Sequence, residues 1–203
     1  MKYLICCGLL ISSLICRSQI REKGDIELTP ILGYSASYQL PTYLFGSSPV
    51  SGIQLGIYAN YFFNNRWSLR SGLSYQKMGT EGIDFLIFTD DYSERTNYIT
   101  LPLTANYHFG TKRNWYINYG ISVGFLIDAE ANYNDGNGFV DINNLANSIQ
   151  IGLNSGIGYK FNVSPKLIML VENANLIGLT DSTSEGNRKN FYISFNIGAV
   201  FKI

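Results

Sequence analysis

Residues 115–127 read Trp-Tyr-Ile-Asn-Tyr-Gly-Ile-Ser-Val-Gly-Phe-Leu-Ile. Large apolar or aromatic side chains fill the odd positions from Trp115 to Ile127, and small or polar side chains such as Asn118 and Ser122 recur between them. Because successive side chains of a strand point to opposite faces, this stretch predicts a β-strand with one apolar and one polar face. Alternation of this kind over about ten residues is typical of strands that cross a membrane.

The distribution of charge indicates which face meets the surroundings. A soluble barrel packs its large apolar side chains inward and carries its charges outward. Here charged residues make up only 15% of the chain, and they gather between the alternating segments. We therefore interpret the apolar face as lipid-facing and the glycine-and-amide face as a barrel interior.

The same alternation returns along the whole chain. An even number of strands lets an antiparallel sheet close with both termini on one side, and closure leaves no unpaired backbone edge in lipid. The sequence therefore predicts an all-β fold, an eight-stranded antiparallel up-and-down transmembrane β-barrel. The expected strands are residues 24–38, 50–63, 66–78, 95–109, 114–127, 147–161, 166–176 and 189–203.

The connections between these segments alternate in length. Outer-membrane barrels have short periplasmic turns and long extracellular loops, so the alternation supports the same fold and places both termini on the periplasmic side. The expected tight turns are residues 64–65, 111–113 and 162–165. The expected long loops are residues 40–49, 79–94, 128–146 and 177–188.

Aromatic residues bunch at one end of each expected hairpin. Amphipathic rings prefer the headgroup level, so this bunching predicts a girdle at the membrane interface. The girdle at the short-turn end would contain Tyr61, Phe62, Phe63, Trp67, Tyr107, Phe109, Trp115, Tyr116, Tyr159, Phe161 and Phe201. A second belt would contain Tyr34, Tyr38, Tyr75, Phe125 and Phe191.

The first residues have the pattern of an export signal. Lys2 precedes a short apolar stretch that ends at Cys16, and Ser18 offers a small residue at the cut. This pattern predicts a Sec-type signal peptide over residues 1–18, cleaved after Ser18, followed by one outer-membrane β-barrel domain over residues 19–203. Cys16 follows Ile15, where lipoprotein signals require a small residue, so lipidation is not expected.

Cleavage would change the composition of the mature chain. All three cysteines lie in the leader, so the mature protein would form no disulfide. Removing Lys2 and Arg17 leaves 13 basic residues against 15 acidic ones, a net charge of about −2. Such a balance does not suggest nucleic-acid binding.

Polar side chains on the inward face form a candidate interior network of Glu27, Gln54, Arg70, Gln150, Lys160 and Glu172. Buried charges must be paired, and Arg70 with Glu172 or Glu27 is the expected ion pair. An eight-stranded barrel is just wide enough for side chains to fill, so the network predicts a structural plug, with a gate or narrow polar path as the alternative. The other expected inward residues are Asn60, Gln76, His108, Asn118, Asn154, Asn196 and Lys202.

Residues able to support catalysis or metal binding are sparse. His108 is the only histidine, and no mature cysteine accompanies it, so a metal site is not expected. A membrane-embedded hydrolase would need its triad near the outer leaflet, and His108 falls near the periplasmic rim. The acidic loop at 128–147 does not have calcium-loop spacing. We therefore expect a non-enzymatic protein without a cofactor.

One predicted loop carries an apolar cluster, Phe85-Leu86-Ile87-Phe88, among acidic residues. An exposed apolar patch is a candidate contact for a partner or ligand. The alternative is that these four residues fold over the barrel mouth.

The segment Tyr98-Ile99-Thr100-Leu101-Pro102-Leu103, which leads into Asn106-Tyr107-His108-Phe109, resembles the PorT-like, porin-family outer-membrane barrels of Bacteroidota. The resemblance continues through the glycine-rich hairpin at 149–166 and the closing strand, although this chain ends Phe201-Lys202-Ile203 rather than in an aromatic residue. It implies an outer-membrane barrel and says little about activity. Pro102 donates no ladder hydrogen bond, so we expect a local bulge there.

The patterns leave several functions open. A membrane scaffold that displays extracellular loops is the leading hypothesis, and a narrow pore or substrate-selective channel is the alternative in the same membrane. A soluble periplasmic ligand-binding barrel and a membrane enzyme are the remaining alternatives. The expected surroundings are outer-membrane lipid, with an unidentified envelope or secretion protein as a possible partner, and the expected state is a monomer.

Overall fold

A computed structural model describes residues 21–40, 48–85, 88–133, 136–164, 167–184 and 188–203. The expected signal peptide, residues 1–18, lies outside the described residues. Within the described part of the chain, no helix has the length and apolar character needed to cross a membrane.

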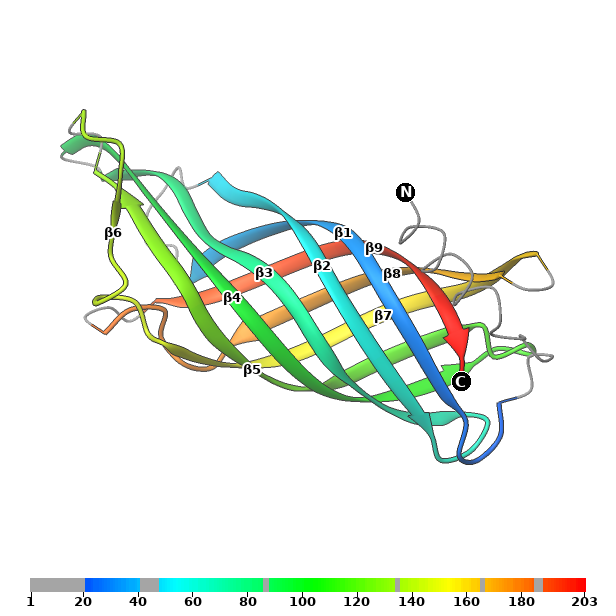
Figure 1. Ribbon diagram of the computed structural model, residues 1–203. Helices are drawn as coiled ribbons and strands as arrows, with labels where there is room; N and C mark the ends of the chain where they lie inside the picture. Colours follow the sequence, from blue (N-terminus) through cyan, green and yellow to red (C-terminus); the bar gives the residue numbers. More distant parts are fainter. Residues whose placement is uncertain (1–20, 41–47, 86–87, 134–135, 165–166, 185–187) are drawn as a thin grey trace, which may run out of the picture.

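The described residues form one continuous antiparallel sheet that closes into a barrel (Figure 1). Its wall consists of β1 (Ile26–Leu40), β2 (Ser48–Phe62), β3 (Trp67–Phe85), β4 (Phe88–Phe109), β5 (Trp115–Asn132), β7 (Ile149–Ser164), β8 (Leu167–Gly178) and β9 (Lys189–Lys202). Each wall strand pairs with its neighbour along the chain, and β1 pairs with β9 to close the circle. The predicted eight-stranded up-and-down barrel is therefore confirmed.

One further strand lies outside the wall. Among the described strands, β6 (Phe139–Asp141) pairs only with the end of β5, where Phe139 faces Asn132. In Figure 1 this strand lies at the barrel end that also holds the tip of the β3–β4 hairpin. We call this end the long-connection end and the opposite end, which holds the C-terminus, the short-turn end.

Local chemistry accounts for two tight turns at the short-turn end. Between β2 and β3, the side-chain oxygen of Asn64 accepts hydrogen bonds from the backbone N–H groups of Arg66, at 2.8 Å, and Trp67, at 3.0 Å. An asparagine side chain that binds the backbone two residues on is a common turn former. Between β4 and β5, Gly110 and Arg113 both have positive φ, and Arg113 N–H donates to Gly110 O at 3.1 Å.

Two expected long loops are wrong in part. Residues 79–85 and 88–94 belong to strands, because β3 continues to Phe85 and β4 starts at Phe88, and Phe85 and Phe88 face each other. Residues 128–146 also contain strand, because β5 extends to Asn132 and β6 follows. Acidic residues and glycines interrupt the apolar alternation in both segments, although β-formers such as Ile83 and Tyr92 support strand structure there.

The expected bulge at Pro102 is also wrong. The register between β3 and β4 is the same on both sides of Pro102, from Ser71 opposite Leu103 to Ser74 opposite Thr100. Pro102 faces Ser122 on β5 without a register shift. The register shift between β4 and β5 lies nearer the long-connection end, between Asn97 and Tyr98. The sheet therefore accommodates Pro102 by the loss of one backbone hydrogen bond and without an extra residue.

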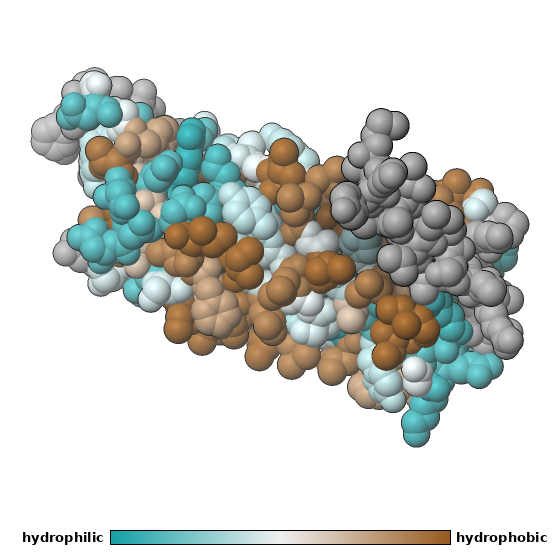
Figure 2. Space-filling model, in the orientation of Figure 1, coloured by the Kyte–Doolittle hydropathy of each residue, from teal (hydrophilic) through white to brown (hydrophobic). Residues whose placement is uncertain are grey.

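Burial is inverted relative to a soluble protein. On β5, Tyr119 is 62% exposed and Ile121 is 49% exposed, whereas Tyr116 on the other face is 1% exposed. Figure 2 shows apolar side chains over the middle of the barrel and hydrophilic ones gathered toward its ends. The interior instead holds serines, threonines, amides and charged groups. The predicted assignment of the polar face to the interior agrees with this burial.

Aromatic rings follow one another around the short-turn end. Trp67 lies 4.9 Å from Tyr107 between ring centroids, and Trp115 lies 4.7 Å from Tyr159. The ring of Phe109 bridges the two pairs. Two residues predicted for this belt are placed differently: Phe62 is fully buried and Tyr116 nearly so, because both occupy inward positions of their strands.

Candidate functional site

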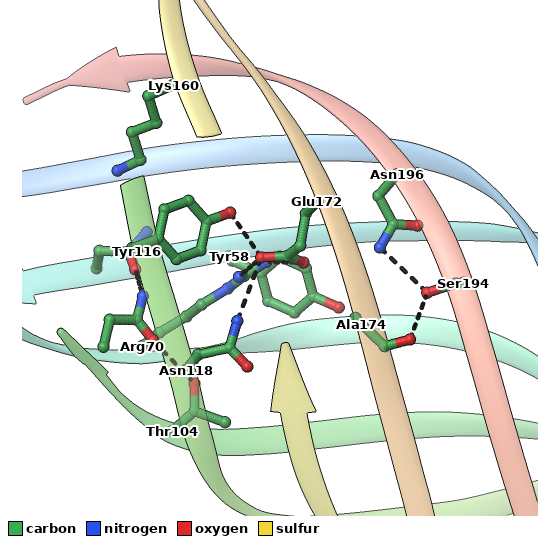
Figure 3. Close-up of polar contacts among 12 residues, drawn as sticks. Tyr58, Arg70, Thr104, Tyr116, Asn118, Lys160, Glu172, Ala174, Ser194 and Asn196 are labelled. Atoms are coloured by element: carbon green, nitrogen blue, oxygen red, sulfur yellow. Dashed lines mark hydrogen bonds and ion pairs between the residues drawn. The ribbon is translucent and has the colours of Figure 1, made fainter. Parts of the chain in front are cut away.

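An ion pair crosses the barrel interior between Arg70 on β3 and Glu172 on β8 (Figure 3). The Arg70 guanidinium donates through Nη1 to Glu172 Oε2 and through Nη2 to Glu172 Oε1, the latter at 3.2 Å. The hydroxyl of Tyr116 donates to the same carboxylate at 2.6 Å. A bidentate arginine–carboxylate pair fixes both distance and orientation. This pair therefore sets how two sides of the wall lie relative to each other.

Neighbouring side chains reduce the cost of burying these charges. The Asn118 amide donates to Glu172 Oε2 at 3.4 Å, and the guanidinium carbon of Arg70 lies 3.9 Å from the ring centre of Tyr58. A cation over an aromatic face is stabilised by the ring quadrupole. Burying an ion pair costs several kcal/mol per ion unless further hydrogen bonds satisfy its remaining groups. Tyr116 and Asn118 supply such hydrogen bonds to Glu172, and the ring of Tyr58 stabilises the Arg70 guanidinium.

A second charged cluster lies toward the short-turn end and contains Glu27, Lys160 and Arg21. Glu27 Oε2 pairs with the Lys160 ammonium, and Glu27 Oε1 accepts from Arg21 Nε at 2.7 Å. Arg21 precedes β1 and also donates to the backbone oxygen of Arg113 at 3.1 Å. The segment before the first strand is thus tied to the β4–β5 turn across the barrel end.

Aromatic and imidazole rings separate the cluster from water. The Lys160 ammonium lies 5.4 Å from the ring centre of Tyr116 and 5.7 Å from that of Phe62. His108 packs against Phe62, with 5.1 Å between ring centroids, and its Nε2 lies 3.2 Å from the Ser68 hydroxyl. Tyr116 therefore touches both charged clusters, through its ring on one side and its hydroxyl on the other.

A small cavity of about 40 Å³ adjoins the Arg70–Glu172 pair. A volume of that size admits only a few water-sized molecules. Amide and hydroxyl groups around it bind one another: Tyr192 donates to Gln54 Oε1 at 2.9 Å, and Thr100 donates to Gln76 Oε1 at 3.0 Å. Gln54, Gln76, Thr100 and Tyr192 are among the residues that line it.

The interior is also closed toward the long-connection end. The Glu94 carboxylate is fully buried, accepts from Gln39 Nε2 at 2.7 Å and pairs with Arg188 at 3.0 Å. An apolar layer lies below it, formed by Met78, Tyr98, Leu176 and Tyr192. Charged and apolar layers therefore alternate along the barrel axis.

The β6–β7 connection packs over this end. Ile142 and Ala146 are buried against Ala129 and Ala131 of β5. The Asn147 side chain donates to the backbone oxygen of Asp181 at 2.8 Å, which joins this connection to the one between β8 and β9. The described parts of two long connections therefore form a joint cover.

The six residues of the predicted interior network all point inward and are buried. The structure brings Arg70 to Glu172, whereas Glu27 meets Lys160 and Arg21 instead. Gln54 belongs to the amide layer beside the cavity. Gln150 is also buried, but its Nε2 has no hydrogen-bond partner within the described part of the chain. The other expected inward residues are buried too, except Asn154 and Lys202, which are half-buried.

Sequence reasoning missed several members of the network. Tyr58 and Tyr116 share the inward parity of their strands, so strict alternation identifies both. Tyr116 was assigned to the aromatic girdle instead, and Tyr58 was not named among the inward residues. Glu94 was expected in a loop. Arg21 precedes the first strand and carries no periodic signal. Of the predicted loop contact, Leu86 and Ile87 lie outside the described residues, as do the side chains of Phe85 and Phe88.

The sequence model of one protein family matches most of the chain. The family is described as an outer membrane protein beta-barrel domain, and the match covers residues 19–184. The chain belongs to this family. A comparison with the sequences of curated proteins finds no significant match.

Several solved structures of small outer-membrane barrels are similar to this chain. OprG from Pseudomonas aeruginosa aligns with a TM-score of 0.52 and 12% identity over 92% of this chain and 99% of its own. Ail of Yersinia pestis aligns with a TM-score of 0.45 and 15% identity over 88% and 99%. The N-terminal barrel domain of OprF from Pseudomonas aeruginosa gives 0.45 and 15% over 89% and 100%. At such identities the OprG match speaks for the fold alone.

Membership of the family places this outer-membrane barrel in lipid, and the exposed apolar face is its lipid contact. Across the described residues, no group of three or more histidine, cysteine, aspartate or glutamate side chains is arranged to hold a metal ion. What the interior arrangement can do chemically is hold charges in fixed pairs. The candidate site is therefore a set of buried ion pairs that connect strands across the interior of the outer-membrane barrel.

Proposed function

We propose that this protein is a non-enzymatic outer-membrane scaffold, closed to solutes, that holds a structured extracellular surface above the membrane. The observation that carries the proposal is the ion-paired interior, in which Arg70–Glu172 and Glu27–Lys160 pair across the barrel and the cavity beside Arg70 measures about 40 Å³. A diffusive channel requires continuous open space, which larger barrels provide. The packed charged layers favour a structural role.

Strand length supports the display part of the proposal. A transmembrane β-strand needs about 9–11 residues. β3 has 19 residues, β4 has 22 and β5 has 18, and the excess lies at the long-connection end. Together with β6, these strands extend the sheet beyond the membrane band. An ordered sheet presents side chains to a partner with less loss of conformational entropy than a flexible loop does.

We propose further that this protein is a PorT-like barrel of Bacteroidota. We also propose that it is exported through a signal peptide at residues 1–18. Sequence motifs alone support both statements. In this view the partners are outer-membrane lipid and an envelope or secretion protein that contacts the displayed sheet. The soluble periplasmic alternative loses its support because the family is one of outer-membrane barrels.

Conductance in planar lipid bilayers tests the closed scaffold. The purified wild-type barrel should insert, as judged by heat-modifiable gel migration, and give no stepwise current above the lipid background. The alternative of a narrow pore predicts discrete steps whose size or selectivity changes in the Arg70→Met/Glu172→Leu double variant and not in Ser71→Ala, a control on the outward face of β3. Such steps in the wild-type protein would overturn the scaffold proposal.

A further inference from the structure

A polar patch interrupts the lipid-facing surface at mid-membrane depth, formed by Ser155 of β7 with Asn173 and Asn175 of β8. Ser155 and Asn175 are register partners, and all three alternate with inward residues such as Glu172. At comparable depth the other outward positions of the described strands carry apolar or aromatic side chains, with isolated serines such as Ser71. The patch is therefore a concentrated exception.

Register fixes the depth of the patch. Tyr159 of the aromatic belt faces Val171, and Ser155 lies four residues before Tyr159 on β7, toward the long-connection end. A tilted strand climbs roughly 2.5 Å of membrane depth per residue, so the patch lies about 10 Å above the belt in an apolar band about 25 Å tall. Headgroups and water are absent at this level. The polar groups must find partners within the hydrocarbon region.

The hydrogen bonds inside the patch do not satisfy all of its polar side-chain atoms. Asn173 Nδ2 donates to the backbone oxygen of Ser194 at 3.2 Å, and Asn175 Nδ2 donates to Asn173 Oδ1 at 3.0 Å. Asn175 Oδ1 and the Ser155 hydroxyl have no hydrogen-bond partner among the residues that the structure describes. In hydrocarbon, each such group carries an unfavourable free energy that a neighbouring polar group removes.

The surrounding surface is apolar. Tyr119 and Phe195, on the strands flanking β7 and β8, are 62% and 66% exposed, and Ile157 and Ile177 lie beside the amides. A partner must therefore offer an apolar surface with hydrogen-bonding groups at the same depth. Acyl chains offer no hydrogen bonds, and small polar side chains let two membrane-embedded surfaces approach closely.

We infer that Ser155, Asn173 and Asn175 form the surface through which a second copy of this chain docks within the membrane. A carboxamide carries both donors and an acceptor, so the patch is complementary to itself. A two-fold axis beside Asn175 lets the free oxygen of one copy accept from the amide of the other, and the reverse. A second copy also brings the required depth and apolar surround by symmetry. This state differs from the monomer expected from the sequence.

Disulfide cross-linking of the purified protein in lipid vesicles tests the inference. Ser155→Cys, oxidised at a high lipid-to-protein ratio, should form a covalent dimer. Ser71→Cys, on the opposite side of the barrel, should not, and the unsubstituted chain controls for the leader cysteines. Adding Asn173→Leu and Asn175→Leu to Ser155→Cys should lower the dimer yield about tenfold, because two polar contacts in the membrane, each worth a few-fold in affinity, are lost.

Each outcome decides the matter. Equal yields from Ser155→Cys and Ser71→Cys would indicate random collision, and no dimer from Ser155→Cys would leave the patch facing lipid; either result overturns the inference. A Ser155→Cys dimer whose yield is unchanged by the two leucines would also contradict it. If Ser155→Cys cross-links only in native membranes and to another protein, the occupant is that protein and not a second copy. Heat-modifiable migration verifies that every variant is folded.

Discussion

Arg70 and Glu172 stand on opposite sides of the barrel, and their side chains meet in its centre. Three strands separate β3 from β8 on one side, namely β2, β1 and β9, and three separate them on the other, namely β4, β5 and β7. Their ion pair therefore spans the diameter of the wall. A rigid bidentate contact at that position resists both flattening and widening of the barrel.

Removing one partner of this ion pair should destabilise the barrel strongly. Glu172→Leu leaves the buried Arg70 guanidinium without its carboxylate, and breaking a buried pair in this way costs about 3–5 kcal/mol. Replacing both residues, as Arg70→Met with Glu172→Leu, should recover most of that loss because neither charge remains. Urea unfolding in detergent micelles, followed by tryptophan fluorescence, measures the free energy of unfolding of each variant.

Ser71→Ala is the matched control, since it changes a polar residue next to Arg70 on the outward face of β3. It should leave the urea midpoint almost unchanged. If the two single variants of Arg70 and Glu172 lose stability by amounts that simply add in the double variant, the side chains do not act as a coupled pair.

The inward set of residues could be predicted because strand parity assigns every second residue to one face. That is why Glu27, Arg70, Lys160 and Glu172 were all identified as interior residues. The pairing among them could not be predicted, because it depends on the stagger of the strands around the barrel. This stagger brings Lys160 rather than Arg70 to Glu27, and alternation carries no information about it.

The extent of the strands was predictable only within the membrane. There, the apolar face makes alternation visible, whereas beyond the membrane the outward face no longer needs apolar side chains and the pattern fades. The missed extension of β3 and β4 has this cause. Phe62 and Tyr116 were assigned to the interface for a related reason. Aromatic side chains suit both an interface and a packed interior, and the prediction followed their aromatic character rather than their inward position in the strand.

Cysteine labelling in intact cells should show which barrel end faces outward. Asn144, in the connection after β6, and Lys112, in the β4–β5 turn, are both exposed and lie at opposite ends of the barrel. With a reagent that does not cross the outer membrane, Asn144→Cys should react in intact cells. Lys112→Cys should react only after the envelope is permeabilised. The reverse pattern would show that the long connections face the periplasm.

The start of β1 and the end of β9 should be joined by an ion pair that depends on pH. Asp25 Oδ2 lies 2.6 Å from the Lys202 ammonium. Slight burial opposes ionisation, but the hydrogen bonds from Lys202 and from the Glu22 backbone N–H outweigh it and hold the pKa of Asp25 below its ordinary value of 3.8. A lowered pKa means that the stabilisation is present above that value and is lost as the pH falls through the folded-state pKa.

Carbon NMR of the Asp25 carboxyl group, titrated in micelles, measures this pKa directly. Lys202→Gln should move the midpoint upward, toward the ordinary value, while Lys112→Gln, in the β4–β5 turn, should leave it unchanged. An unchanged midpoint in Lys202→Gln would show that the ion pair between Asp25 and Lys202 does not form in solution.

The Tyr116 ring in the barrel interior should require a glycine at position 158. A Cβ on Gly158 would lie 2.2 Å from Cζ of Tyr116, so Gly158→Ala must push the ring away from Glu172. Overpacking of this kind costs about 1–3 kcal/mol. Gly124→Ala is the control, because its nearest contact would be 3.3 Å, to Thr100. Urea unfolding measures the loss of unfolding free energy caused by Gly158→Ala. This loss should be smaller when Tyr116 is replaced by leucine, because the displaced ring is then absent. An equal loss in both backgrounds would mean that the backbone, and not the ring, clashes with the added methyl group.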